Sequence, residues 1–196
     1  DSATGLTAFH FAQEKPHANY LISLVAGYFK KLEDTCRDIP LAFYTPPSEF
    51  AHAANSFRHT KDMVAFFEKE IGVPYPWAKY DQICVNDFVA GGMENTSITT
   101  LTDGTLFTAA TENLEDSEGL VSHELAHQWF GDSVSPATWN DIWLNEGFAT
   151  FAQWLWAEHD RGEAAYEEMV AGNYQFLAEA AHNHGRVKPD VFVLVS

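Results

Sequence analysis

Residues 121–132 have the sequence VSHELAHQWFGD, in which His123 and His127 stand four positions apart. The apolar residues around the two histidines recur at helical spacing, which predicts a helix over residues 117–130. On a helix, side chains four positions apart share one face, with their Cβ atoms about 5–6 Å apart. Two imidazoles placed in this way can each reach one metal ion at about 2.0–2.1 Å. The stretch therefore predicts a metal site.

Two glutamates complete the predicted site. A catalytic zinc takes three protein ligands and leaves one coordination position for water. Glu146 lies on the next predicted helix and is the candidate third ligand, beside His123 and His127. Zinc lowers the pKa of bound water to about 7, and a neighbouring carboxylate such as that of Glu124 can accept the proton. We therefore predict one Zn²⁺ per chain, with Glu124 as general base.

Composition narrows the classes of function. The 196 residues carry a formal net charge of −17, which opposes binding to a phosphate backbone, so no nucleic-acid partner is expected. The longest apolar run, residues 20–29, is about half of what a membrane span needs, and no span is predicted. Cys36 and Cys84 are too few for a disulfide framework and form no CxxC pair.

The order of the predicted elements favours an α+β fold, because strands and one helix come first and a run of helices follows. Strands are expected at residues 6–11, 20–29, 41–45, 82–89 and 96–101, and helices at 49–71, 117–130, 140–159 and 164–181. A charged break ending in Pro40 suggests a boundary, with residues 1–40 as the end of a neighbouring β-rich domain.

Three motifs together resemble the aminopeptidase N family of zinc aminopeptidases, which also includes leukotriene hydrolase. They are HELAHQWFGD at residues 123–132, WNDIWLNEGF at 139–148 and GGMEN at 91–95. The zinc motifs alone indicate the broader gluzincin class, and GGMEN narrows the resemblance to this family. The resemblance implies the same zinc ligands and the same general base that the residue types suggest.

The resemblance also implies a domain organisation. Residues 1–40 would end an N-terminal β-saddle domain, and residues 41–196 would form a thermolysin-like catalytic domain truncated at its C-terminal end. We therefore expect the chain to be a fragment, with further N- and C-terminal domains in the full-length protein. The family's oxyanion-stabilising tyrosine lies well downstream of the third ligand, and no residue of this chain can be matched to it.

The same resemblance implies a substrate-binding role for Gly91, Gly92, Met93, Glu94 and Asn95. Glu94 would hold the free α-amino group of a peptide, so that only the first peptide bond reaches the metal. Glycines in the segment let the substrate backbone approach closely. Most aminopeptidases of the family have alanine where this chain has Gly92, whereas leukotriene hydrolase shares the glycine.

The predicted function is hydrolysis of the N-terminal peptide bond of peptides with a free N-terminus, through a metal-activated water. Three alternatives stay open at this point: a zinc endopeptidase, an epoxide hydrolase on the same scaffold, and a non-catalytic binding domain. The first would also cleave N-acetylated peptides, and the second would turn over a lipid epoxide. The third would be expected to lack a zinc ligand or the base, and all four residues are present.

Overall fold

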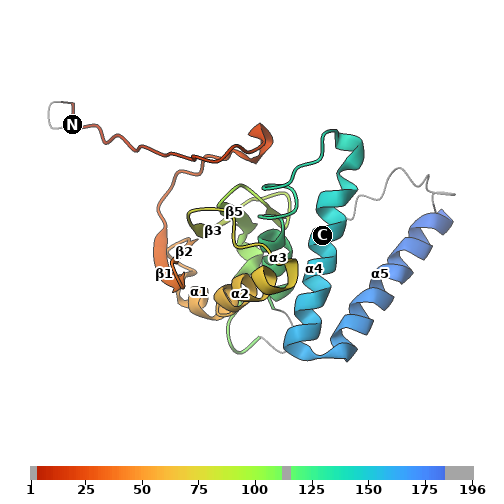
Figure 1. The fold of residues 1–196 in the computed structure, drawn as a ribbon. Coiled ribbons are helices and arrows are strands. Elements are labelled where there is room, and N and C mark those ends of the chain that lie inside the picture. The colour runs from red at the N-terminus through yellow and green to blue at the C-terminus, as the bar shows by residue number, and fades with distance from the viewer. Residues whose placement is uncertain (1–3, 112–115, 184–196) are drawn as a thin grey trace.

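A computed structural model describes residues 4–111 and 116–183. A mixed sheet with the strand order β1-β2-β3-β5-β4 forms its centre (Figure 1). The strands are β1 (Lys30–Cys36), β2 (Ile39–Thr45), β3 (Tyr80–Val85), β4 (Gly92–Met93) and β5 (Ile98–Thr102). The α-helices are α1 (Phe50–Ser56), α2 (Thr60–Ile71), α3 (Glu118–Ala126), α4 (Trp143–Arg161) and α5 (Glu163–Asn183). Short 3₁₀ turns are η1 (Asn19–Leu21), η2 (Asp103–Thr105) and η3 (Trp139–Asp141).

The centre of the sheet is parallel and its edges are antiparallel. β2, β3 and β5 run in one direction, while β1 and β4 pair antiparallel at the two ends. Parallel strands are usually buried on both faces, and β3 follows this rule from Tyr80 to Cys84. α1 contacts β1 and β2, α2 contacts β1, and α3 contacts β4 and lies between α2 and α4. The edge strand β4 therefore stands directly beside the helix that carries the histidine pair.

The strands predicted at residues 6–11 and 20–29 are wrong. The structure has no strand before Lys30 in the residues it describes, and the segment runs away from the sheet, with η1 its regular turn (Figure 1). A strand needs a partner for its backbone groups, and these apolar residues find none in the described chain. Within residues 20–29, Leu21 alone is buried, at 1% exposure. It follows Tyr20, which contacts the site described below.

The single helix predicted over residues 49–71 is two helices, α1 and α2, separated at residues 57–59. Phe57 leaves the helical path to stack on Phe43 of β2, with ring centroids 4.8 Å apart. Arg58 and His59 turn toward a buried glutamate on α3. The end of α2 is as predicted, because Gly72 caps it in the left-handed conformation with φ of 75°.

Two strands were not predicted: β1 occupies the stretch expected to be a charged break, because it pairs with β2, and the short β4 pairs with β5. The other elements match their predictions with shifted bounds. β2, β3 and β5 lie at the strands predicted over residues 41–45, 82–89 and 96–101. α3 ends at Ala126, before the predicted end at residue 130, and α4 and α5 lie at the last two predicted helices. The fold is thus mixed α and β, as expected. The predicted domain boundary at residue 40 falls inside β2, and the division into two domains stays a prediction.

The buried core joins the sheet to the helices. Its aromatic members include Phe67 of α2, Tyr80 of β3 and Trp129 beyond α3, each at most 3% exposed. Cys36 and Cys84 are free thiols within this core, as the sequence suggests. Within the two described ranges, no helix is both long and apolar enough to cross a bilayer.

Candidate metal centre

The histidine pair is brought together by α3. His123 lies on the helix, and His127 caps it with φ of −59° and ψ of −24°, so the helical spacing continues for one further residue. The Nε2 atoms of the two rings are 3.1 Å apart, and both side chains are buried. His127 Nδ1 lies 2.9 Å from the Phe130 carbonyl oxygen, to which it donates when that nitrogen is protonated. This hydrogen bond turns Nε2 of His127 toward His123.

Glu146 reaches the pair from the first turn of α4. Its Oε2 atom lies 3.4 Å from Nε2 of His123 and 3.5 Å from Nε2 of His127. The carboxylate can approach because α4 packs closely against α3. Burial acts to raise the pKa of Glu146, but contacts with the two imidazoles outweigh it and hold the pKa at about 2. Glu146 is therefore an anion at neutral pH.

The two imidazoles differ in their electrostatic surroundings. Burial lowers the pKa of His123, and Glu146 acts in the opposite direction. The lowered pKa favours the neutral ring, which is the form that binds metal. Burial also acts to lower the pKa of His127, but the carboxylates of Glu146, Glu94 and Glu124 raise it to about 9. In the metal-free chain, His127 thus carries a proton at neutral pH that a bound cation would have to displace.

Glu124 lies next to the histidine pair, with its carboxylate against Gly92 of β4. Its side chain is 3% exposed, and burial raises its pKa to about 8, with Glu94 and Glu146 adding to the rise and His127 opposing it. Its Oε2 atom has no hydrogen-bond partner among the described residues. A Cβ atom placed on Gly92 would lie 2.2 Å from Oε1 of Glu124. The glycine of β4 therefore provides the space that this carboxylate occupies.

Glu94 follows β4 and is buried at 7% exposure. Single ligand atoms of Glu94, Glu124 and His127 all lie within 4.8 Å of one another. The GGMEN segment is thus next to the candidate metal centre. Asn95 is engaged within the protein, since Nδ2 donates to the Leu21 carbonyl and Oδ1 accepts from Thr100 Oγ1. Contact of the five motif residues with substrate stays a prediction.

Gln128 connects the GGMEN segment to the histidine helix. Its Oε1 atom accepts a hydrogen bond from the Ser97 amide at 2.8 Å, and its Nε2 atom donates to the Glu94 carbonyl at 3.3 Å. The Tyr75 hydroxyl, which donates to the Lys79 carbonyl at 3.0 Å, also lies 3.4 Å from Oε1. Gln128 is completely buried. The residue after the second histidine thus fixes the turn that follows Glu94.

Sequence reasoning missed three residues at this centre. Tyr20 accepts a hydrogen bond from Nδ2 of Asn145 at 3.3 Å, and Asp132 is buried with its pKa raised to about 8 by burial and by Glu94. Asn145 precedes Glu146 and Asp132 ends the first zinc motif, so both lie in stretches already singled out. Tyr20 lies 125 positions before Asn145, in an apolar run, and no sequence pattern indicated a role for it at this site.

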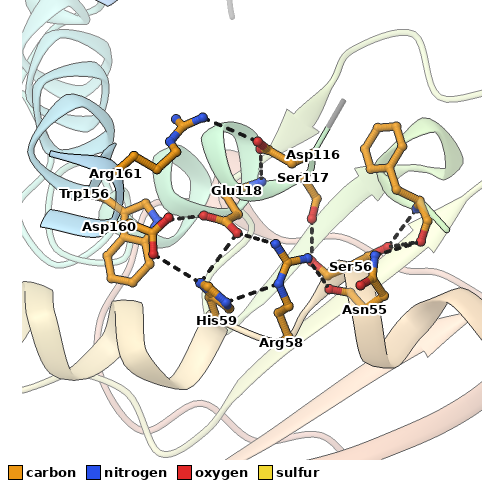
Figure 2. A network of polar contacts seen from close by, with 11 residues as sticks. Asn55, Ser56, Arg58, His59, Asp116, Ser117, Glu118, Trp156, Asp160 and Arg161 are labelled. Atoms are coloured by element: carbon orange, nitrogen blue, oxygen red, sulfur yellow. Dashed lines mark hydrogen bonds and ion pairs between the residues drawn. The ribbon is translucent and has the colours of Figure 1, made fainter. Parts of the chain in front are cut away.

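A second cluster of metal-ligand type is held by an arginine. His59 Nδ1 lies 3.5 Å from Glu118 Oε1 and 3.6 Å from Asp160 Oδ1, on the far ends of α3 and α4 (Figure 2). Arg58 Nη2 donates to Glu118 Oε1 at 2.8 Å, and Arg58 Nε donates to His59 Nε2 at 3.1 Å. Trp156 Nε1 donates to the other oxygen of Glu118. The cluster is a satisfied ion-pair network that already contains its cation.

Comparison with known proteins agrees with the motifs. The sequence matches a protein-family model, that of the peptidase family M1 domain, over residues 55–189. Aminopeptidase N of Canis lupus familiaris is 36% identical over 170 residues, which is 82% of this chain and 17% of that protein. Endoplasmic reticulum aminopeptidase 1 of Homo sapiens is 31% identical over 179 residues, covering 89% of this chain and 18% of its own length.

A further relative is the mitochondrial aminopeptidase 2 of Saccharomyces cerevisiae, 36% identical over 163 residues, or 81% of this chain and 17% of the yeast protein. The chain thus spans less than a fifth of the length of each of these curated relatives.

Proposed function

The chain belongs to peptidase family M1, and from this premise we propose that it carries the catalytic centre of a zinc-dependent aminopeptidase. The substrates would be peptides with a free N-terminus, and the bond hydrolysed would be the first peptide bond. The observation that carries the proposal is the convergence of three side chains, those of His123, His127 and Glu146, on one point between α3 and α4.

The donor set fits zinc. Three ligand atoms at about 2.0–2.1 Å from a tetrahedral ion stand about 3.4 Å apart. The distances between the three donor atoms are 3.1, 3.4 and 3.5 Å. Two imidazoles and one carboxylate form a usual catalytic zinc set, and His127 has the second hydrogen bond that orients such a ligand. When bound, zinc supplies Lewis acidity that lowers the pKa of a water ligand.

Glu124 is proposed as the group that moves the proton. Its unpartnered Oε2 atom is free to accept one from water and later to deliver it to the leaving amine. Without a cation beside it, burial raises the pKa of this carboxylate to about 8 and favours its protonated form. A nearby dication lowers the pKa again and restores the anion.

Glu94 is proposed as the anchor for the substrate amine. An α-ammonium group at this buried carboxylate would form a charge-assisted hydrogen bond in a place that excludes water. The surroundings favour a cation, because the neighbouring Glu146 is an anion at neutral pH. Gly91 and Gly92 would let the substrate backbone approach β4 closely. This anchor is what distinguishes an aminopeptidase from an endopeptidase on the same zinc site.

The wider organisation is part of the proposal. We infer a thermolysin-like catalytic domain, preceded by the end of a β-saddle domain within residues 1–40. The oxyanion-stabilising tyrosine and the groups that select the N-terminal residue would then come from regions outside these 196 residues. Alone, the 196-residue chain is expected to bind zinc but to hydrolyse aminoacyl substrates poorly.

The decisive experiment compares a peptide with a free N-terminus and its N-acetylated form, using the complete protein. The free peptide should be hydrolysed at least about 100-fold faster, since acetylation removes the charge that Glu94 would bind. A chelator should abolish hydrolysis, and added Zn²⁺ should restore it. Equal cleavage of both peptides would indicate an endopeptidase, and preferential turnover of a lipid epoxide would indicate an epoxide hydrolase.

A further inference from the structure

The turn η1 of the N-terminal segment is held from two sides by buried asparagine side chains. Nδ2 of Asn95 donates to the carbonyl of Leu21 at 3.2 Å, and Nδ2 of Asn145 donates to the hydroxyl of Tyr20 at 3.3 Å. The two asparagines are 4% and 1% exposed. One belongs to the GGMEN segment and the other immediately precedes Glu146. The turn therefore joins the proposed substrate side of the centre to its metal side.

The side chain of Tyr20 fits this position with both its ring and its hydroxyl. The ring packs on Trp139 of η3, with centroids 4.9 Å apart and planes inclined at 59°. The segment that precedes Glu146 is therefore contacted at its two ends, at Trp139 by the ring and at Asn145 by the hydroxyl. Burial, Glu94 and Asp132 raise the pKa of Tyr20 to about 12, so the phenol stays neutral.

Asn145 has little freedom to move. A Cβ atom placed on Gly131 would lie 2.9 Å from Nδ2 of Asn145, so the amide packs directly on this glycine. Gly131 closes the turn that follows His127 and has φ of 121°, a conformation that favours glycine. The Asn145 amide thus lies between the turn after the second histidine and the Tyr20 hydroxyl, one residue before the third metal ligand.

We propose that Tyr20 is a positioning residue for the third zinc ligand, which it controls through Asn145. The hydrogen bond from Asn145 fixes the first turn of α4, and that turn sets where the Glu146 carboxylate meets the two imidazoles. The inference rests on the proposed function, because Glu146 is taken as a zinc ligand. It adds a residue that touches neither metal nor substrate and comes from outside every recognised motif.

The test measures zinc affinity by competition with a chromophoric chelator, in the complete protein. Tyr20→Phe keeps the ring on Trp139 and removes only the hydroxyl. Loss of a residue that orients a metal ligand weakens metal binding about 10- to 100-fold, and we expect about 10-fold here. Tyr28→Phe is the matched control, because Tyr28 is 95% exposed and precedes the sheet. The control should bind zinc as the wild type does.

A double-mutant cycle separates positioning from general loss of structure. Asn145→Ala removes the same hydrogen bond from its other end and should also weaken zinc binding. If the pair acts through this contact, adding Tyr20→Phe to Asn145→Ala should cause little further loss. Additive losses, or unchanged affinity in Tyr20→Phe, would overturn the inference. Should Tyr20→Phe fail to fold, Asn145→Ala alone decides, since unchanged zinc affinity there equally refutes it.

The outcome also separates this inference from the function on which it rests. Absence of zinc binding in the wild-type protein would refute the proposed function itself. Tight binding by the wild type with equal binding by Tyr20→Phe would refute the positioning role alone.

Discussion

Two clusters of histidine and carboxylate side chains lie at different ends of the helix pair α3 and α4, and their buried charges are balanced in different ways. His59, Glu118 and Asp160 surround a point with spacings of 3.5 and 3.6 Å, close to those of the metal centre. There Arg58 supplies the positive charge and donates to both His59 and Glu118. Distance alone therefore does not identify a metal site.

The candidate metal centre lacks a permanently charged partner of this kind, since its only basic groups among the described residues are the imidazoles of His123 and His127. In the described parts of the chain, no lysine or arginine forms an ion pair with Glu94, Glu124 or Glu146, and buried carboxylates are costly without a cation. Nδ1 of His123 and Oε2 of Glu124 have no hydrogen-bond partner among these residues. The difference supports the proposal that the arginine network serves stability, whereas the cluster without lysine or arginine receives a metal cation.

The comparison is tested most strongly at the two buried glutamates of α3. Glu124→Gln should lower kcat about 1,000-fold in the complete protein, because an amide cannot accept the proton from water. Zinc content, measured by atomic absorption, should stay the same. Glu118→Gln is the counterpart in the arginine network and should leave the kcat of the folded protein within a few-fold. Intact turnover in Glu124→Gln would show that another group is the base.

A second test uses the two ends of α4. Glu146→Ala should weaken zinc binding by more than about 100-fold, since losing a ligand exceeds the usual effect of losing a residue that only orients one. Asp160→Ala removes a carboxylate of the same helix from the arginine network and should leave zinc affinity unchanged. Chelator competition measures both variants. Comparable losses in the two would mean that the clusters do not differ in the way we infer.

The arginine network should instead reveal itself in stability. Glu118→Ala removes the carboxylate that accepts hydrogen bonds from Arg58 and Trp156, and losing a charge-assisted bond lowers the free energy of unfolding by about 1.5–3 kcal/mol. Glu33→Ala is the control, because Glu33 forms an exposed pair with Lys31, for which about 0–1 kcal/mol is expected. Urea denaturation of the zinc-free proteins measures both. Equal stabilities would remove the structural role assigned to the network.

The smallest expected effect concerns the packing of the base. Gly92→Ala would place a methyl group at the position of the Glu124 carboxylate, and a forced rotamer costs about 1 kcal/mol. We expect kcat to fall only a few-fold with zinc affinity unchanged, because the atoms in the way are the end of a side chain that can shift. Gly104→Ala is the matched control, because its Cβ atom would make ordinary contacts with Thr102, at 3.6 and 3.8 Å. Unchanged kcat in Gly92→Ala would show that Glu124 has a second conformation of equal energy.

The parts of the centre that depend on local geometry could be predicted from the sequence. The spacing of His123 and His127 follows from one helical turn, and the structure brings their Nε2 atoms together. Glu146 lies on the following long helix, and its approach needed only close packing of α4 on α3. Both inferences use periodicity, which a single sequence displays.

Features that depend on distant partners could not be predicted. The helix break at residues 57–59 arises because Phe57, Arg58 and His59 find partners on β2, α3 and α4. Tyr20 meets Asn145 across 125 positions of the chain, and nothing in its own neighbourhood indicates this contact. The apolar run around Tyr20 suggested a strand because alternation and length are local signals, whereas the presence of a partner strand is not.

The buried side chain of Gln128 has a consequence for how a peptide could enter and leave. Two of its hydrogen bonds, with the Ser97 amide and the Glu94 carbonyl, join the turn after Glu94 to the end of the histidine helix. Separating these parts would break both bonds in a dry interior, at a cost of about 1 kcal/mol or more for each. We therefore expect the histidine pair, the proposed base and the proposed amine anchor to move as one body. Any hinge that admits substrate has to lie outside them.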